Sequence, residues 1–161
     1  MKITLTPVEI ASAAQVGLLR RVSSIQNKLT DRRMNPNQMN WEIDIEGACA
    51  ELAAAKGLNI FWCCGINTFK AADLGSNIQV RHTAKRSNRL IIRDGDKAED
   101  VFVLVTGSAP EYEIVGWVLG KDGKNPSYLN DANDIGKPAY FVPQSALSPI
   151  ATLIQSRRRV V

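Results

Sequence analysis

Asp73, Gln79 and Arg81 are the side chains whose types and spacing could carry chemistry in this sequence. They flank Gly75-Ser76-Asn77, which is typical of a turn between two strands. In an antiparallel pair, opposite residues point to the same face and side chains alternate along each strand. If Asp73 lies opposite Gln79, an acid, an amide and a base converge on one face, whereas a shift of one residue disperses them. Buried polar groups need partners or a function, because leaving them unpaired is costly.

Glu51 is a further candidate, from an alanine-rich segment that we predict to be helical. A purely structural interpretation competes with a functional one. In that interpretation Glu51 faces solvent, and Asp73 forms an ordinary surface salt bridge with Arg81. The spacing of the residues does not decide between the two.

Taken in order, Glu51 on a helix, Asp73 on a strand and Gln79-Val80-Arg81 on the next strand form a recognisable pattern. It resembles the PD-(D/E)XK nuclease superfamily, especially its small phage and bacterial members, over about residues 42–119. The resemblance implies a restriction-endonuclease-like core and metal-dependent hydrolysis of DNA. A hard cation such as Mg²⁺ or Mn²⁺, held by oxygen ligands, stabilises charge on phosphate and activates water.

The resemblance also implies a role for each residue. Asp73 would be the central metal ligand, joined by the amide oxygen of Gln79 and the backbone carbonyl of Val80. Glu51 would bind the metal directly or through water, and Arg81 would contact the scissile phosphate or orient the attacking water.

Two positions depart from the family pattern, since Gln79 replaces an acid and Arg81 replaces a lysine. Arginine stays protonated and suits bidentate phosphate contact better than activation of water. A second interpretation is therefore a DNA-binding or interaction module that has lost turnover. A third is a structural or regulatory protein whose polar cluster only holds a sheet together.

Basic residues are concentrated after the candidate site, with five cations within thirteen residues from Arg81 to Arg93. Clustered cations attract phosphates, so Arg81, Lys85, Arg86 and Arg89 are predicted to contact DNA. The alternative is a solvated loop. Three further arginines, Arg157 to Arg159, nearly close the sequence.

Hydrophobic periodicity and turn residues predict the elements that position these groups. Thr6, Pro7 and Glu9 fit a capping box that begins a helix extending to about Leu29, followed by a loop from Thr30 to Asn40. A second helix is predicted from about Asp44 to Lys56, ended by Gly57. Strands are predicted at 60–64, 69–73, 78–83, 90–93, 101–106, 112–119 and 139–142, with a last helix from Pro149 to about Gln155. This order favours an α/β or α+β fold with a mixed central sheet flanked by helices.

The totals fit one globular domain of 161 residues with 45% apolar residues, a net charge of +4 and three cysteines. We expect an accessory helix and loop over residues 1–40 and a nuclease-like core over 41–161. No apolar run approaches the roughly 20 residues of a membrane span. The start of the sequence lacks a signal-peptide pattern, and the cysteine spacing favours a reducing cytoplasm. The expected partner is DNA rather than a membrane, and a homodimer is kept as an assembly to be tested.

Overall fold

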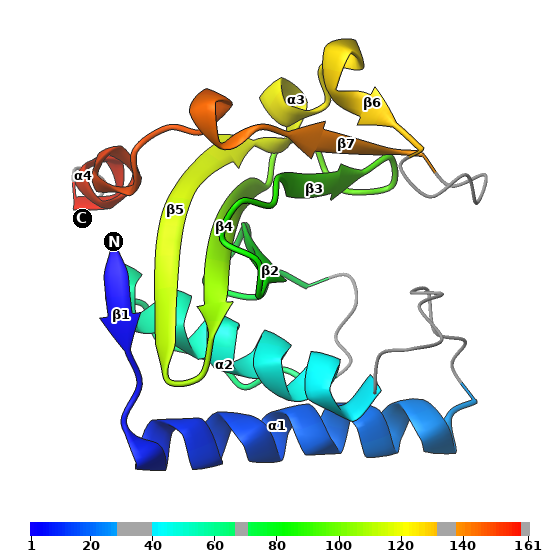
Figure 1. Ribbon diagram of the computed structural model, residues 1–161, viewed down its shortest axis with the longest axis vertical. Coiled ribbons are helices and arrows are strands. Elements are labelled where there is room, and N and C mark those ends of the chain that lie inside the picture. Colours follow the sequence, from blue (N-terminus) through cyan, green and yellow to red (C-terminus); the bar gives the residue numbers. More distant parts are fainter. Residues whose placement is uncertain (29–39, 67–70, 132–137, 159–161) are drawn as a thin grey trace.

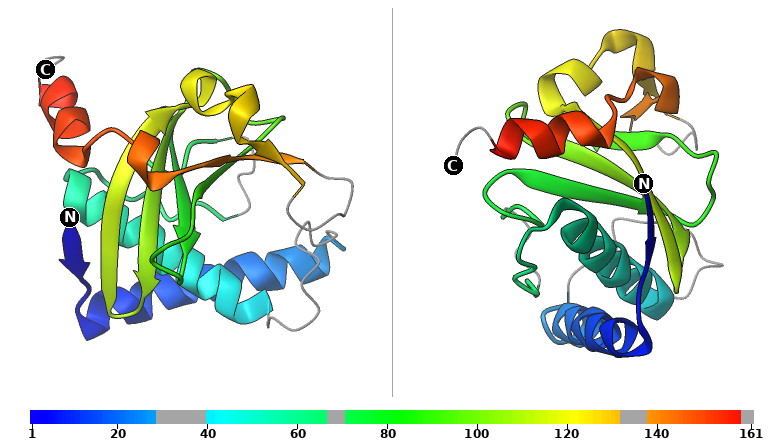
Figure 2. Two further views of the ribbon diagram at one scale, coloured as in Figure 1. Left: turned by 45° about the horizontal axis from the view of Figure 1, so that its top comes forward. Right: turned by 90° about the vertical axis from the view of Figure 1, so that its left-hand side faces the viewer.

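The computed structural model describes residues 1–28, 40–66, 71–131 and 138–158, which form an α+β fold. Its helices, strands and short 3-10 turns follow the chain in the order β1 (Lys2–Thr4), α1 (Pro7–Gln26), α2 (Asn40–Leu58), β2 (Ile78–Thr83), β3 (Leu90–Arg93), β4 (Val101–Ser108), β5 (Glu111–Leu119), α3 (Gly120–Gly123), η1 (Pro126–Tyr128), β6 (Leu129–Asn130), β7 (Ala139–Val142), η2 (Gln144–Ala146) and α4 (Ile150–Arg158). Figures 1 and 2 show these elements in layers: α1 lies outside α2, α2 covers a mixed sheet, and a smaller sheet lies beyond it. The predicted α+β fold with a mixed sheet is confirmed, but a second sheet, and not a helix, covers the face of the mixed sheet opposite α2.

Helix α1 begins as its sequence predicts. The Thr6 side chain accepts from the Glu9 amide at 3.3 Å, the Glu9 carboxylate accepts from the Thr6 amide at 2.7 Å, and Pro7 occupies the first turn. The helix ends at Gln26, before the predicted end at Leu29, and Asn27 is its C-cap. The predicted loop lies outside the described residues as far as residue 39, and its last residue, Asn40, belongs to α2 instead.

Helix α2 is longer than predicted, and its end is formed differently. The helix continues through Gly57 to Leu58, and Asn59, with φ of 53°, adopts the left-handed conformation that we expected of Gly57. Gly57 is instead a point of close packing, because a Cβ there would lie 2.4 Å from Cδ1 of Ile114. The glycine thus lets the helix approach the sheet.

The central sheet has the strand order β1-β5-β4-β2, so β2 is one of its edges. Strand β4 pairs in parallel with β2 and antiparallel with β5, and most of its residues are buried on both faces. Val101, Val103 and Val105 pack toward α2, while Phe102 and Leu104 face the opposite side.

The second sheet, in the order β3-β7-β6, covers that opposite side. Leu90, Ile92 and Val142 of this sheet are fully buried against Phe102 and Leu104. The described residues form two hydrophobic cores, and the larger one lies on the side of the central sheet that faces α2. Helix α4 contributes Ile150 and Leu153 to this larger core. Among the described residues, no helix combines the length and apolar character needed to cross a membrane.

Two predicted strands are absent or reduced. Residues 60–64 form an irregular segment rather than a strand. Of the strand predicted over 69–73, residues 69 and 70 lie outside the described part, and residues 71–73 are irregular. Only Leu74 pairs, through a single bridge to Ile78. The side chain of Trp62 is nevertheless buried, because it packs into the larger core although residues 60–64 make no β-sheet hydrogen bonds.

The two long helices approach each other closely at Gly17. A Cβ at this position would lie 2.5 Å from the Ile45 Cα and 2.6 Å from the Asp44 carbonyl oxygen. Both atoms belong to the backbone of α2, so no side-chain rotation can relieve the overlap.

We therefore expect Gly17→Ala to destabilise the protein by about 1 to 3 kcal/mol through overpacking. Gly47→Ala is the matched control, because a Cβ at Gly47 on α2 would meet nothing within 4 Å. The control should gain about 0.5 to 1 kcal/mol from the better helix propensity of alanine. Urea denaturation of both variants measures the difference, and equal effects would contradict the tight helix crossing.

Candidate functional site

Asp73 is fixed at the free edge of the central sheet. The Leu74–Ile78 bridge closes a three-residue turn that contains Gly75, with φ of 58°, in a register that places Asp73 opposite Gln79. The ladder then stops, because the Val80 amide donates to Oδ2 of Asp73 at 2.7 Å. A carboxylate has taken the place that a backbone carbonyl would occupy in a longer hairpin.

This hydrogen bond also orients the backbone of Val80. Within a parallel ladder, the N–H and carbonyl of one residue point to the same side of the strand. Since the Val80 N–H points away from β4 to Asp73, its carbonyl also points out of the free edge. The Asp73 carboxylate and the Val80 carbonyl are therefore neighbours along this edge.

Glu51 lies on the buried side of α2, which excludes the solvent-facing alternative. Glu51 as a whole is only 8% exposed to solvent. Arg20 of α1 donates from both terminal nitrogens to the two Glu51 oxygens, each at 2.7 Å. The indole nitrogen of Trp62 donates to Oε2 of Glu51 at 3.1 Å. Burial lowers the pKa of Arg20, but the hydrogen bonds and charge of Glu51 outweigh burial and raise it.

Asp73 and Glu51 are close enough to influence each other electrostatically. Burial raises the pKa of Asp73 to about 6, and the neighbouring negative charge of Glu51 adds to the rise. The Val80 hydrogen bond and the charges of Arg81 and Arg20 work in the opposite direction. Two carboxylates from segments far apart in sequence thus share one partly desolvated location.

Gln79 lies opposite Asp73 in the turn register, but its amide nitrogen bonds to other groups. The nitrogen donates to Asp100 at 3.0 Å and to the Ala71 carbonyl at 3.4 Å. Asp100, at the start of β4, is 6% exposed, so Gln79 satisfies a buried acid. No described residue donates to the amide oxygen of Gln79.

Arg81 joins the two sheets rather than pairing with Asp73. Its terminal nitrogen donates to Asp96 at 2.9 Å, and its Nε donates to the Ile91 carbonyl at 3.2 Å. The guanidinium lies 5.0 Å from the centre of the Phe102 ring. Gln79 and Arg81 alternate with the core residues Ile78 and Val80, so they extend toward the second sheet and Glu51 lies on the other side.

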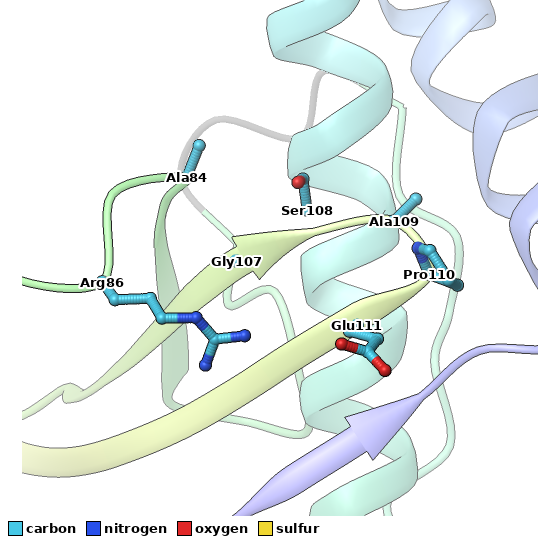
Figure 3. A pocket seen from close by; sticks show the side chains of 7 residues that line it. All are labelled: Ala84, Arg86, Gly107, Ser108, Ala109, Pro110 and Glu111. Carbon is cyan, nitrogen blue, oxygen red and sulfur yellow. The ribbon is translucent and has the colours of Figure 1, made fainter.

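The basic segment lies beyond the far end of β2. Arg86 forms an exposed ion pair with Glu113 at 3.0 Å, whereas Lys85 and Arg89 have no charged partner in the described part of the chain. Arg86 also lines a pocket of about 330 Å³ between the loop after β2 and the β4–β5 turn (Figure 3). None of Glu51, Asp73, Gln79 and Arg81 lines this pocket. Of the terminal arginines, Arg159 lies outside the described residues.

Three side chains that organise the site were not predicted as part of it: Arg20, Trp62 and Asp100. Arg20 lies within the amphipathic pattern of α1, where a cation facing another helix has no local signature. Asp100 belongs to the acidic stretch after β3, and its burial and its contact with Gln79 are properties of the tertiary structure.

The donor set is compatible with a hard divalent cation, although it is sparse. Asp73 Oδ1, the Gln79 amide oxygen and the Val80 carbonyl are oxygen donors of the kind that Mg²⁺ prefers. The Val80 carbonyl accepts only a long contact of 3.4 Å from Arg81. No group of three His, Cys, Asp or Glu side chains is gathered for a metal within the described residues.

Comparisons of the chain with protein families, with curated proteins and with solved structures found no match. The function of the chain is therefore inferred from its residues and their geometry.

Asp73→Asn should stabilise the metal-free protein at pH 7.5 by about 1 to 3 kcal/mol, because one pKa unit corresponds to about 1.4 kcal/mol. Asparagine can still accept from the Val80 amide but carries no buried charge. The folded pKa of Asp73 is raised, so the folded state binds more protons between pH 3.8 and about 6. The free energy of unfolding therefore falls as pH rises through this window.

The advantage of Asp73→Asn should accordingly vanish near pH 4. Urea denaturation in EDTA across this range is the measurement. Asp94→Asn, at an exposed aspartate, is the control and should follow the wild type. A variant no more stable than wild type at pH 7.5 would show that Asp73 carries no buried-charge penalty.

Proposed function

We propose that the protein is a metal-dependent nuclease whose site is built from Asp73, Glu51, Gln79 and the Val80 carbonyl. The observation that supports this most is the Asp73–Val80 hydrogen bond at the free edge of β2. It holds a partly desolvated carboxylate beside an outward-pointing carbonyl, with a second carboxylate nearby. Hard oxygen donors held together in this way are what a divalent cation requires.

A bound Mg²⁺ or Mn²⁺ would stabilise charge on a phosphate ester and lower the pKa of water. The chain's own contribution is to position oxygen donors. Val80 fixes the Asp73 carboxylate through its amide, and Asp100 and Ala71 hold the nitrogen of Gln79 so that its oxygen remains available. The Trp62 indole holds Oε2 of the Glu51 carboxylate at 3.1 Å.

Arg81 retains a role in phosphate contact under this proposal, with a constraint set by its neighbours. Asp96 accepts from Nη2 and the Ile91 carbonyl accepts from Nε, while Nη1 makes only the long contact with the Val80 carbonyl. A guanidinium has five N–H donors, so others remain for a phosphate. The Asp96 ion pair and the Phe102 ring would hold the guanidinium in place while it makes that contact.

We expect wild type to bind Mn²⁺ and cleave DNA, and Asp73→Asn to lose both. The loss would not come from unfolding, because this substitution is expected to stabilise the fold. Calorimetric titration with Mn²⁺ and single-turnover cleavage of single-stranded, double-stranded and branched DNA are the measurements.

Glu99→Gln is a suitable control for the loss of one acidic group, since Glu99 is exposed and lies outside the site. It should bind metal and cleave as wild type does. Equal Mn²⁺ binding by wild type and Asp73→Asn, or none by either, would remove the metal-site proposal.

A second candidate function is DNA binding without turnover. The Arg20–Glu51 ion pair favours it, because Glu51 already has a cation on both of its oxygens. In this case Lys85 and Arg89 would contact the phosphate backbone, and no metal would produce cleavage.

DNA affinity should then fall steeply with salt, because each neutralised phosphate releases counterions. Replacing Lys85 and Arg89 with alanine should reduce the slope of log affinity against log salt by about 1 to 2. Arg86 is left in place because it pairs with Glu113. The variant Lys2→Ala/Lys121→Ala removes the same charge from exposed positions elsewhere and should keep the wild-type slope. Equal slopes in both double variants would mean that residues 85–89 form only a solvated loop.

A further inference from the structure

The Arg20–Glu51 pair has the geometry of a strong, specific ion pair. Both contacts are 2.7 Å, and the side chains are only 17% and 11% exposed. The Nε of Arg20 also donates to the Gly65 carbonyl at 2.8 Å, which fixes the plane of the guanidinium. Planar, bidentate contact of this kind is more directional than a lysine contact.

The hydrogen bonds around Glu51 leave little room for another ligand. An ionised carboxylate offers about four lone-pair positions. Arg20 uses one on each oxygen, and the Trp62 indole uses another on Oε2. A cation that binds Glu51 directly must therefore use the remaining position on Oε1 or displace Arg20.

Arg20 also affects Asp73 without touching it. The charge of Arg20 lowers the pKa of Asp73, and the charge of Asp73 raises that of Arg20. Glu51, Asp73 and Arg20 thus form one electrostatic group. With Arg20 the group carries one net negative charge, and without it two.

We propose that Arg20 is the resident counter-ion of the candidate site and competes with the divalent cation for Glu51. This inference depends on the proposed metal site and adds a determinant of its affinity. It gives α1 a role beyond that of an accessory helix. Metal affinity rises with the negative charge of the ligand group. The site as built is therefore a weak metal site, and Arg20 sets that weakness.

The neighbouring pair Arg21–Asp44 supplies a matched control. It joins the same two helices at 2.7 Å, with side chains 12% and 24% exposed. Arg21→Gln removes a partly buried interhelical ion pair without touching Glu51. It should lower stability and leave the Mn²⁺ affinity at the wild-type value.

The experiment is a calorimetric Mn²⁺ titration of wild type, Arg20→Gln, Glu51→Gln and the double variant, with thermal unfolding as a check of folding. Arg20→Gln should bind Mn²⁺ at least about tenfold more tightly, because a repelling charge and a competitor are both removed. Glu51→Gln should bind more weakly than wild type. The double variant restores one net negative charge and should bind near the wild-type affinity.

Two further comparisons keep the test decisive if Arg20→Gln alone fails to fold. The double variant contains a neutral pair able to hydrogen-bond, and it should bind Mn²⁺ more tightly than Glu51→Gln. Arg20→Lys keeps the charge and should stay near the wild-type affinity. In the wild type, Mn²⁺ should also change the fluorescence of Trp62, a change that Trp62→Phe should remove.

Folded Arg20→Gln with unchanged affinity would overturn the inference. Weaker binding by this variant would overturn it as well, since Arg20 would then position Glu51 for the metal. Failure of the proposed function has a different signature: wild-type Mn²⁺ binding would be absent or insensitive to Asp73→Asn.

Discussion

The close backbone contact between α1 and α2 at Gly17 is the constraint on which the candidate site depends. Only a residue without a Cβ lets the Ile45 backbone approach so closely. Arg20 lies one helical turn further along α1, and this approach brings its guanidinium onto Glu51. Removing one partner of a buried ion pair leaves an uncompensated charge, which is strongly destabilising. The helix crossing and the Arg20–Glu51 pair therefore support each other, and together they fix the position of Glu51 on α2.

The second organising feature is the free edge of β2. Exposed strand edges present unpaired N–H and carbonyl groups. Here one N–H is satisfied by the Asp73 carboxylate, so the edge is partly closed by a side chain that could serve a metal. The same strand anchors both sheets, because Ile78 and Val80 pack toward α2 while Arg81 reaches Asp96 and Phe102. Residues of β2 thus contribute both to the candidate site and to the packing of the fold.

Short-range sequence patterns correctly predicted the helix start and the strands that are determined by neighbouring residues in the chain. The capping box at Thr6 and the strands 78–83, 90–93 and 139–142 were predicted correctly because each depends on short-range pattern. The segment 60–64 was predicted wrongly as a strand. Its apolar residues reflect the packing of Trp62 into the core and not pairing in a β-sheet. Gly57 was assigned to a helix end, although its lack of a side chain is needed for contact with Ile114. Single-residue signals of this kind are ambiguous, because a glycine can serve conformation or proximity.

For the site, the sequence alone determined the candidate residues Glu51, Asp73, Gln79 and Arg81, and it allowed the register that sets Asp73 opposite Gln79, which the Leu74–Ile78 bridge then selects. Alternation along one strand is a property of the chain itself, so it could be deduced without tertiary information. Only the tertiary structure decided the partner of each group: Arg20 for Glu51, the Val80 amide for Asp73, Asp100 for Gln79 and Asp96 for Arg81. The reason is physical. Charge and hydrogen-bond partners depend on distances between segments far apart in the chain, and helix packing and sheet order set those distances.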